Sequence, residues 1–398
     1  MYSAQQIQAY LEAHQDELFE CRHHLHRHPE IGLDLPQTQA FIVSKLKAFG
    51  VDEIHTDIAD SAIVAVIHGK HKTDKWIGIR ADMDGLPLKE DSGAPYASAI
   101  DGRAHSCGHD GHMTVALGVC RFLADNRDFN GTVAVIFQPG EEGFAGSRRL
   151  VEAGLFERFP IAEVYAMHGE PDLDLGDIGI APGYVMASAD IFSIDVEGKG
   201  GHGARPHEAV DSVLVASQIV VTAQSIISRN VEPLKGGVVS FGCIKSGDES
   251  GSSVLPQKAK LVGTCRSFEP EVRNLIEQRL ASVAQGVAAS LGAQAFCDYR
   301  RLYPALLNHT EQAQAVKDIA VAWLGESHVK GEEPQMTAED FAFMTQKRPG
   351  CLFRLGLRDR EHIFSLHQCG FDFNDKAIVT GSTLLTATAL NRLEVVNA

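Results

Sequence analysis

The chain has little positive charge. Its 398 residues include 36 Lys and Arg against 52 Asp and Glu, which gives a formal net charge of −16 at pH 7. Nucleic acids and anionic membranes bind clustered Lys and Arg, so this balance predicts neither as a partner. Long apolar runs are also missing. No stretch approaches the length of a membrane span, and the first residues lack the basic and apolar segments of a secretory signal.

Cysteine is not arranged as a disulfide framework. The eight cysteines are scattered, and several lie in apolar runs where buried reduced thiols are normal. The sequence therefore predicts a cytoplasmic protein. Of these cysteines, Cys107 is the one whose surroundings resemble a metal site.

Residues 105–112 read His-Ser-Cys-Gly-His-Asp-Gly-His. A thiol, imidazoles and a carboxylate suit zinc, cobalt, nickel or manganese better than magnesium or calcium. Further donors each follow an apolar, strand-like run, and they are Glu141, Glu142, His168 and His367. Sites in open α/β sheets form beyond the carboxyl ends of the strands, so these donors can converge. His168 or His367 alone would be more typical of an ordinary hydrogen-bonded histidine, and only the ordered set favours a ligand role.

The length predicts two domains, and 44% hydrophobic residues supply ample core. Alternating strand and helix patterns predict an α/β fold, with a mostly parallel sheet covered by helices in residues 1–185 and 301–398. The first helix is expected over residues 4–26. Between residues 186 and 300 the order changes to β-α-β-β-α-β, which is typical of a ferredoxin-like α+β module. We expect this insert to be a lid and dimerisation domain.

Several motifs follow one another in a specific order. They are Leu-His-Arg-His-Pro-Glu at 25–30, Arg-Ala-Asp-Met-Asp-Gly-Leu-Pro at 80–87, Cys-Gly-His-Asp-Gly-His at 107–112, Gln-Pro-Gly-Glu-Glu-Gly at 138–143, Gly-Gly-His-Gly-Ala-Arg-Pro-His at 200–207, Gly-Thr-Cys-Arg-Ser-Phe at 263–268, Ala-Glu-Asp-Phe at 338–341 and Phe-Asp-Phe-Asn-Asp at 371–375. Through these motifs and their order, the chain resembles the M20 metallopeptidase family. The resemblance is to its amidohydrolase branch, which contains hippurate hydrolases, indole-acetyl-amino-acid hydrolases and N-acyl-amino-acid deacylases.

The resemblance implies two divalent ions per subunit, either manganese, zinc, cobalt or nickel. Their implied ligands are Cys107, His109, Glu142, His168 and His367. It also implies Glu141 as the general base in hydrolysis of N-acyl amino acids to a carboxylic acid and an amino acid. Two metals can activate water and polarise an unreactive amide carbonyl, while a shielded carboxylate moves the proton.

Other roles follow from the same resemblance. His202 is implied to stabilise the oxyanion across a dimer interface, and Arg266 to bind a substrate carboxylate, for which a guanidinium is apt. Asp84 and Asp110 are expected to orient ligands or cap helices rather than bind metal. A homodimer is implied, because an edge strand and a helix of the insert can pair with a copy.

The chain departs from the family pattern at several places near the predicted site, including Ala104 and Ser106, where the family commonly reads Met-His-Ala-Cys. Ser253 replaces the asparagine of Asn-Val-Ile-Pro, Gly169 replaces the asparagine after the ligand histidine, and Gln368 replaces the usual proline after His367. None removes an implied ligand or the base. We therefore expect the chemistry to be retained and the substrate preference to be altered.

Three alternatives remain open. The same family includes dipeptidases and carboxypeptidases, and these are distinguished by whether the acyl side of the substrate must carry a free amine. Cys107 could instead be a nucleophile paired with His109 or His112, giving a metal-free hydrolase. The chain could also be a non-catalytic metal-binding homologue, although Glu141 is retained.

Overall fold

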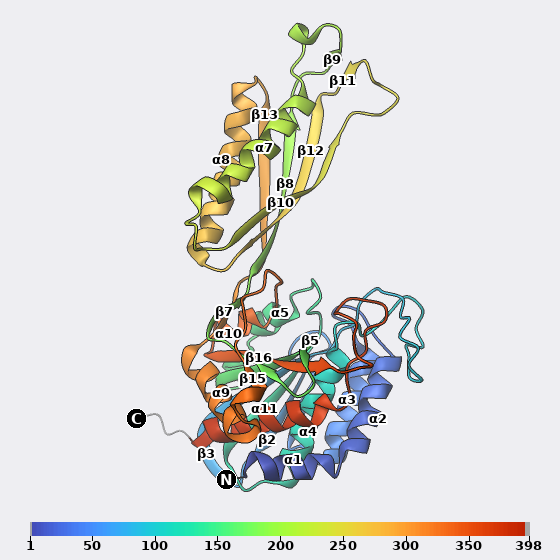
Figure 1. Cartoon of the computed structure of the whole chain (residues 1–398), viewed down its shortest axis with the longest axis vertical. Coiled ribbons are helices and arrows are strands. Elements are labelled where there is room, and N and C mark those ends of the chain that lie inside the picture. The colour runs from blue at the N-terminus through green and yellow to red at the C-terminus, as the bar shows by residue number, and fades with distance from the viewer. Residues whose placement is uncertain (1, 395–398) are drawn as a thin grey trace. The chain divides into compact units, whose positions relative to one another are not determined.

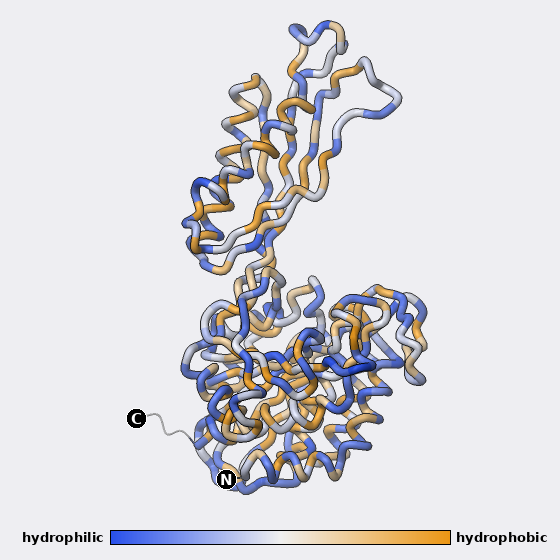
Figure 2. The backbone as a smooth tube through the Cα atoms, viewed as in Figure 1, coloured by the Kyte–Doolittle hydropathy of each residue, from blue (hydrophilic) through white to orange (hydrophobic). Residues whose placement is uncertain are grey.

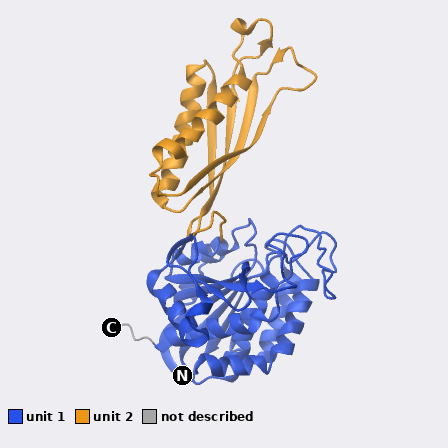
Figure 3. Cartoon of the chain, viewed as in Figure 1, with its two compact units in different colours: residues 1–185, 307–333, 340–398 blue, residues 186–306, 334–339 orange. Residues whose placement is uncertain are grey.

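The structure, a computed structural model, describes residues 2–394. It divides into two compact units (Figure 3): unit 1 comprises residues 1–185, 307–333 and 340–398, and unit 2 comprises residues 186–306 and 334–339. The second boundary lies beyond residue 300, because strand β13 (Gln294–Tyr303) continues past it. Residues 334–339 join unit 2 because the backbone N–H of Ala187 lies 3.0 and 2.9 Å from the carbonyl oxygens of Gln335 and Thr337.

Unit 1 is built on an eight-stranded sheet (Figure 1), in the order β1-β2-β4-β3-β5-β16-β6-β15. The strands are β1 (Glu53–His55), β2 (Ile63–His68), β3 (His71–Asp82), β4 (Asn130–Gln138), β5 (Ile161–Asp174), β6 (Ile178–Gly179), β15 (Val329–Lys330) and β16 (Gly350–Arg358). The central run β4-β3-β5-β16 is parallel. Towards the edges, β1 pairs antiparallel with β2, β2 with β4, and β6 with β16. Apart from the exposed start of β3 and the end of β5, the central strands are mainly apolar and buried on both faces, as a covered parallel sheet requires.

Helices cover this sheet. They are α1 (Ala4–Glu12), α2 (Gln15–Arg27), α3 (Pro36–Phe49), α4 (His109–Asp125), α5 (Gly146–Glu152), α6 (Leu155–Arg158), α9 (Thr310–Leu324), α10 (Ala342–Thr345) and α11 (Ala377–Glu394), with a 3-10 turn η2 (Glu326–His328). Hydrophobic residues gather in the interior of unit 1 (Figure 2), where α4 and α11 contribute to one core with the sheet. Gly118 allows α4 to pack closely on α11. A Cβ at this position would lie only 2.4 Å from the hydroxyl of Ser382.

The single helix expected over residues 4–26 is wrong, because the chain breaks it between α1 and α2. A ring nitrogen of His14 bonds the carbonyl of Tyr10 (2.8 Å) and the ring stacks on that of Tyr10. The backbone N–H of His14 donates instead to Leu11 (3.0 Å). A side chain that takes the i−4 carbonyl competes with the helical ladder, which accounts for the break.

Unit 2 has a four-stranded antiparallel sheet in the order β10-β12-β8-β13. Its elements are β8 (Ser188–Glu197), α7 (Ser212–Asn230), β10 (Gly237–Ser246), β12 (Lys258–Ser267), α8 (Pro270–Ser290) and β13. This is the ferredoxin-like arrangement that the sequence predicted. A separate two-stranded piece pairs β9 (Gly201–His202) with β11 (Val254–Leu255) beside the 3-10 turn η1 (Pro206–Glu208), and β7 (Gly183–Met186) pairs with β14 (Leu306–Asn308).

The α7 helix corrects one expectation from the sequence. It has 19 residues, and an 18-residue window of it has a mean hydropathy of 1.2, so by length and composition alone it could cross a membrane. A core helix passes the same test, and one face of α7 is buried against the sheet of unit 2 through Val215, Ile219 and Ile226. We therefore interpret α7 as a core helix of this module.

Candidate metal centre

The start of α4 brings Cys107 and His109 together. Gly108 precedes the helix with φ 87°, a left-handed conformation that glycine adopts without strain. The ring of Phe373 packs against this turn, so closely that a Cβ on Gly111 would lie 2.4 Å from it. The tight turn directs the side chains of Cys107 and His109 to the same side.

Cys107 lies at the centre of a cluster of donors. Its Sγ is 3.6 Å from Nε2 of His168 and 3.3 Å from Nε2 of His367. That same nitrogen of His367 is 3.2 Å from Oε1 of Glu142. Ligand atoms of Cys107, His109 and His168, and of Cys107, Glu142 and His367, lie within 4.8 Å of one another. The structure thus brings the five predicted ligands together within unit 1.

These distances fit a metal ion between the donors. Metal–sulfur and metal–nitrogen bonds of about 2.3 and 2.1 Å at a roughly tetrahedral angle separate the two donors by about 3.6 Å. The buried ring of His109 gives a second indication. Within the described residues neither of its nitrogens has a hydrogen-bond partner, although oxygens of Asp84, Asp82 and Glu142 lie 3.6, 3.7 and 4.0 Å away. A buried polar ring without a partner is costly, and a cation between His109 and these carboxylates would satisfy it.

The electrostatics of the cluster agree with a cation. Burial raises the pKa of the Cys107 thiol well above its usual range, and Glu142 and Glu141 raise it further. Burial alone would lower the pKa of His109, but Asp82, Asp84 and Glu142 outweigh it and raise that pKa to about 10. A thiolate beside carboxylates therefore requires positive charge that a bound metal ion would supply.

His168 presents its Nε2 to the cluster because its other nitrogen is engaged. Nδ1 of His168 bonds the carbonyl of Gly169 (2.8 Å), which sets the tautomer. His168 lies inside β5 rather than after it, since the strand continues to Asp174. A Cβ on Gly169 would lie 2.8 Å from Leu357 and 3.0 Å from Phe373, so these side chains leave no room for a larger residue there.

His112 and Asp82 belong to this site, and the sequence interpretation did not assign them to it. Nδ1 of His112 bonds Oδ1 of Asp82 (2.7 Å), and its Nε2 accepts the backbone N–H of Gly169 (2.9 Å). His112 thereby fixes the backbone beside His168. The signal for it was its position three residues after His109 on α4, which places both rings on one side of the helix.

A buried polar network supports Asp82 from behind. The guanidinium of Arg80 donates to Asp82 (2.8 Å), Gln138 (2.8 Å) and Asp340 (2.9 Å). Asp340 also accepts the backbone N–H of Ser147 (2.9 Å). The network ties the ends of β3 and β4 to the start of α5.

Asp84 holds the acidic pair. Its two oxygens accept the backbone N–H groups of Glu141 (2.9 Å) and Glu142 (3.1 Å). Glu141 is 8% exposed, and its carboxylate lies within 4.8 Å of ligand atoms of His109 and Glu142. The predicted base is thus beside the predicted ligands, on a loop oriented by Asp84.

The carboxylate of Asp110 contacts residues of α2. It bonds Nδ1 of His26 (2.7 Å) and pairs with Arg22 (3.2 Å), both on α2. These contacts hold the helix α4 against α2, and the role of Asp110 in orienting a ligand or capping a helix stays a prediction.

The remaining predicted residues lie on unit 2. His202 and Ser253 are exposed neighbours: Gly203 donates to the Ser253 carbonyl (2.7 Å), and Ala204 to Nδ1 of His202 (3.1 Å). Arg266 lies towards the other end of β12 from this pair and bonds the Cys265 carbonyl (2.9 Å). Their roles toward a substrate stay predictions.

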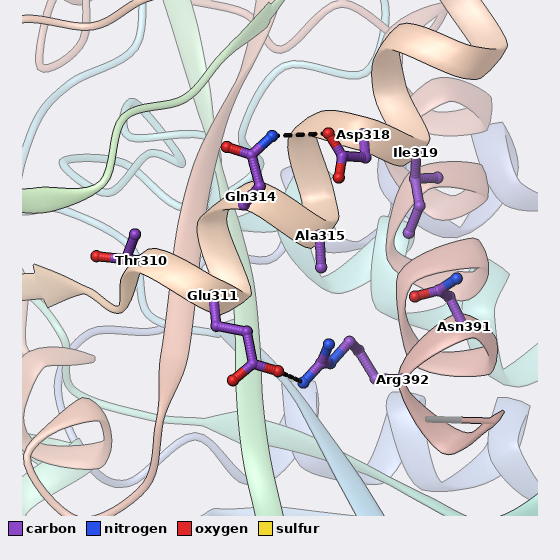
Figure 4. Close-up of a pocket in the computed structure, with 8 residues that line it drawn as sticks. All are labelled: Thr310, Glu311, Gln314, Ala315, Asp318, Ile319, Asn391 and Arg392. Atoms are coloured by element: carbon purple, nitrogen blue, oxygen red, sulfur yellow. Dashed lines mark hydrogen bonds and ion pairs between the residues drawn. The ribbon is translucent and has the colours of Figure 1, made fainter. Parts of the chain in front are cut away.

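A separate polar pocket lies between α9 and α11 (Figure 4). Glu311 and Arg392 pair across it (2.5 Å), and Gln314 donates to Asp318 (2.7 Å). The residues that line it include none of the predicted ligands, so it is not part of the candidate centre.

Comparison with known proteins decides the family. The model of "Peptidase family M20/M25/M40" matches residues 78–391. The chain belongs to this family. It is 34% identical over 381 residues to a hippurate hydrolase of Campylobacter jejuni, covering 96% of this chain and 97% of that one. It is also 34% identical over 380 residues to an N-acetylcysteine deacetylase of Bacillus subtilis, covering 95% and 97%.

A solved structure agrees with this family assignment. A dinuclear metal-binding M20 peptidase of Bacillus subtilis superposes with a TM-score of 0.85 at 31% identity, covering 97% of this M20 chain and 100% of the other. The predicted family, fold class and general activity are confirmed: the chain is a metal-dependent hydrolase of amide bonds.

Proposed function

We propose that this M20 hydrolase cleaves the amide bond of small N-acyl amino acids, releasing a carboxylic acid and an amino acid. The observation that carries the proposal is the convergence of three histidines, a cysteine and a glutamate from four segments beside Glu141. The relatives named hippurate hydrolase and N-acetylcysteine deacetylase support the substrate class. The identity of the acyl group and of the amino acid is the part that a substrate panel must decide.

The proposed ligands of two divalent ions are Cys107, His109, Glu142, His168 and His367, with manganese, zinc, cobalt and nickel as the candidate ions. When bound, two such ions lower the pKa of water and polarise the amide carbonyl. The protein's own part is to hold these donors in place, through the tautomer of His168, the Asp82–His112 pair and the bonds from Asp84.

Glu141 is the proposed general base. It takes a proton from the attacking water and gives it to the leaving nitrogen, so one carboxylate serves both proton transfers. The backbone bond to Asp84 fixes the loop that carries Glu141, and Oε1 of its neighbour Glu142 lies 3.2 Å from Nε2 of His367. Proton transfer by a positioned group contributes about 10²- to 10⁴-fold to such reactions.

Unit 2 is proposed to complete the site in a homodimer. His202 of the partner subunit would donate to the oxyanion, and Arg266 would bind the substrate carboxylate as a guanidinium fork. Ser253, beside His202, would leave more room for the substrate than the asparagine common in relatives. The apolar side chains exposed on α7 and β10, Val221 at 67% and Ile244 at 54%, support a self-association surface.

We also propose a cytoplasmic location. All eight cysteines lie in the described part of the chain as free thiols, and five of them are buried. Buried reduced thiols persist in a reducing compartment.

The first experiment is hydrolysis of a panel of N-acyl amino acids by metal-stripped protein, before and after addition of manganese, zinc or cobalt. Glu141→Gln is compared with Glu142→Gln. We expect Glu141→Gln to bind metal as the parent does while kcat falls about 10²- to 10⁴-fold. Glu142→Gln should lose bound metal as well.

Three outcomes would contradict the proposal in different ways. Turnover that survives metal removal and stops on thiol alkylation would favour the Cys107 nucleophile, which the raised pKa of that thiol disfavours. Cleavage that requires a free amine on the acyl side would favour a dipeptidase. Stoichiometric metal without turnover on any substrate would favour a binding protein.

A further inference from the structure

Arg22 is a fully buried cation that the proposed function does not use. It lies on α2 and pairs with Asp110 (3.2 Å), Asp372 (2.7 Å) and Asp375. Its guanidinium also lies 4.4 Å from the ring centre of Tyr96, whose hydroxyl donates to Asp372 (2.7 Å). A buried arginine shared by three carboxylates holds its partners in a fixed geometry, because each loses strong charge-assisted bonds if it moves.

The three carboxylates lie on two segments that carry proposed ligands. Asp110 directly follows His109 at the start of α4. Asp372 and Asp375 follow His367 in the loop before α11. Arg22 is therefore the cation that both ligand segments share.

The position of His367 depends on how this loop docks. His367 has a φ of 61°, a left-handed conformation that is rare outside glycine and asparagine, so its local backbone does not favour the observed geometry. Its N–H donates to the carbonyl of Ser106 (2.8 Å), and the carbonyl of Cys369 accepts from Asp91 (2.7 Å). External contacts must therefore hold the loop.

Removing Arg22 would replace attraction by repulsion between Asp110 on α4 and the two aspartates of the loop before α11. Asp110 is fully buried, and the side chains of Asp372 and Asp375 are 16% and 21% exposed. Asp110 would keep His26 and Asp375 would keep His23 (2.7 Å), but the cation paired with carboxylates of both segments would be lost. The loop would then be repelled from the start of α4, and His367 would move away from Cys107.

We propose that Arg22 is a positioning residue that sets His367 against Cys107 and Glu142, and so controls how tightly one of the two metal ions binds. This rests on the proposed metal centre. Arg22 touches neither the ligands nor the substrate. Its effect should therefore fall on the ion that His367 holds more than on the ion held by His109 and His168.

The test is a cobalt(II) titration of metal-stripped protein, followed by the absorbance of the thiolate–cobalt charge-transfer band and by competition with a chromophoric chelator. The variants are Arg22→Met, Arg22→Lys and the control Arg392→Met. Arg392 is also a buried arginine, bonded to Glu163 by two contacts of 2.8 and 2.7 Å, but it links α11 to β5 rather than the two ligand segments. Residues that hold metal ligands in place without touching the metal typically contribute about 10- to 100-fold to metal affinity.

We expect Arg22→Met to weaken one of two cobalt ions about 10- to 100-fold while the other binds as in the parent. Arg22→Lys should recover part of the loss, because it keeps the charge but not the several donors. Arg392→Met should bind both ions as the parent does. If Arg22→Met does not fold, Asp372→Asn with Asp375→Asn leaves Arg22 paired with Asp110 and should give the same selective loss.

Equal binding of both ions by a folded Arg22→Met or by the double aspartate variant would overturn the proposal. Equal weakening of both ions, as general destabilisation would cause, would overturn it too. Failure of the parent protein to bind cobalt would instead contradict the proposed metal centre.

Discussion

The two ring nitrogens of His112 make different bonds, one to Asp82 and one to the backbone of Gly169. Conservative variants can separate them. An asparagine amide reaches the position of Nδ1 and a glutamine amide that of Nε2, so His112→Asn keeps the bond to Asp82 and His112→Gln keeps the bond to Gly169. Because Gly169 follows the ligand His168, the backbone bond acts on the ligand.

We predict that His112→Asn weakens metal binding about 10- to 100-fold, whereas His112→Gln weakens it less. Chelator competition on metal-stripped protein measures both. Equal affinities in the two variants would mean that the contact with Gly169 does not position His168.

A second residue, His26, makes the stability of the fold depend on pH. Burial works to lower its pKa, but Asp110 and Glu90 outweigh burial and the nearby Arg22 and raise that pKa to about 9. The unfolded value is about 6.5, so the folded state binds the proton more tightly. The stabilisation from charged His26 is therefore complete below about pH 6.5 and is lost as the pH rises through about 9.

We predict that His26→Gln lowers the thermal midpoint of metal-free protein at pH 6.5, and that the difference from the parent shrinks towards pH 9.5. A difference that stays constant over this range would show that the charge of His26 does not stabilise the fold. Thermal scans at matched ionic strength suffice, because screening otherwise changes with buffer.

At the scale of elements, the approach of α4 to the loop before α11 depends on Gly111. A Cβ there would lie 2.4 to 2.5 Å from ring atoms of Phe373. Alanine would gain about 0.5–1 kcal/mol of helix propensity, but forcing the ring aside costs about 1–3 kcal/mol. The clash should win.

We predict that Gly111→Ala lowers the free energy of unfolding by about 1–2 kcal/mol and that adding Phe373→Leu restores part of it. Gly286→Ala in α8 is the control. A Cβ at Gly286 meets nothing within 4 Å, so that change should stabilise by up to about 1 kcal/mol. Urea unfolding measures all three, and a stabilising Gly111→Ala would contradict the packing argument.

Elements with strong periodicity were predictable from the sequence, and those whose limits depend on distant contacts were not. The β-α-β-β-α-β order of unit 2 was predicted from its strand and helix patterns, which are clearest in the alternating strands β8 and β12 and in the helix α7. The break before α2 was missed because His14 competes for a backbone carbonyl that no pattern marks. The strand β5 extends beyond its apolar run because its polar end pairs with β16.

The site shows the same division. Its five donors were singled out because they lie in short motifs or directly after apolar runs of the sequence. Arg80, Asp82 and Arg22 were not found. Arg80 and Asp82 bond each other, but the contacts that join them to other parts of the site, and those of Arg22, reach 58, 30 and up to 350 residues along the chain. Spacing along a sequence cannot reveal a bond of that kind.

At the scale of the whole molecule, the proposed dimer can be tested by mixing two inactive variants. Glu141→Gln lacks the proposed base and His202→Ala lacks the proposed oxyanion donor. If His202 serves the metal centre of its partner, a heterodimer of the two contains one site with an intact Glu141 and an intact His202.

Random exchange makes about half the dimers mixed, with one working site in each, so activity should recover to about a quarter of that of the parent. Val221→Glu on α7, where the side chain is 67% exposed, is the control: it should keep the fold of unit 2 but block association, and so prevent recovery. Size-exclusion chromatography of each mixture, read beside the rate, separates the explanations. Dimers that form without recovered activity would mean that His202 acts within its own chain or not at all.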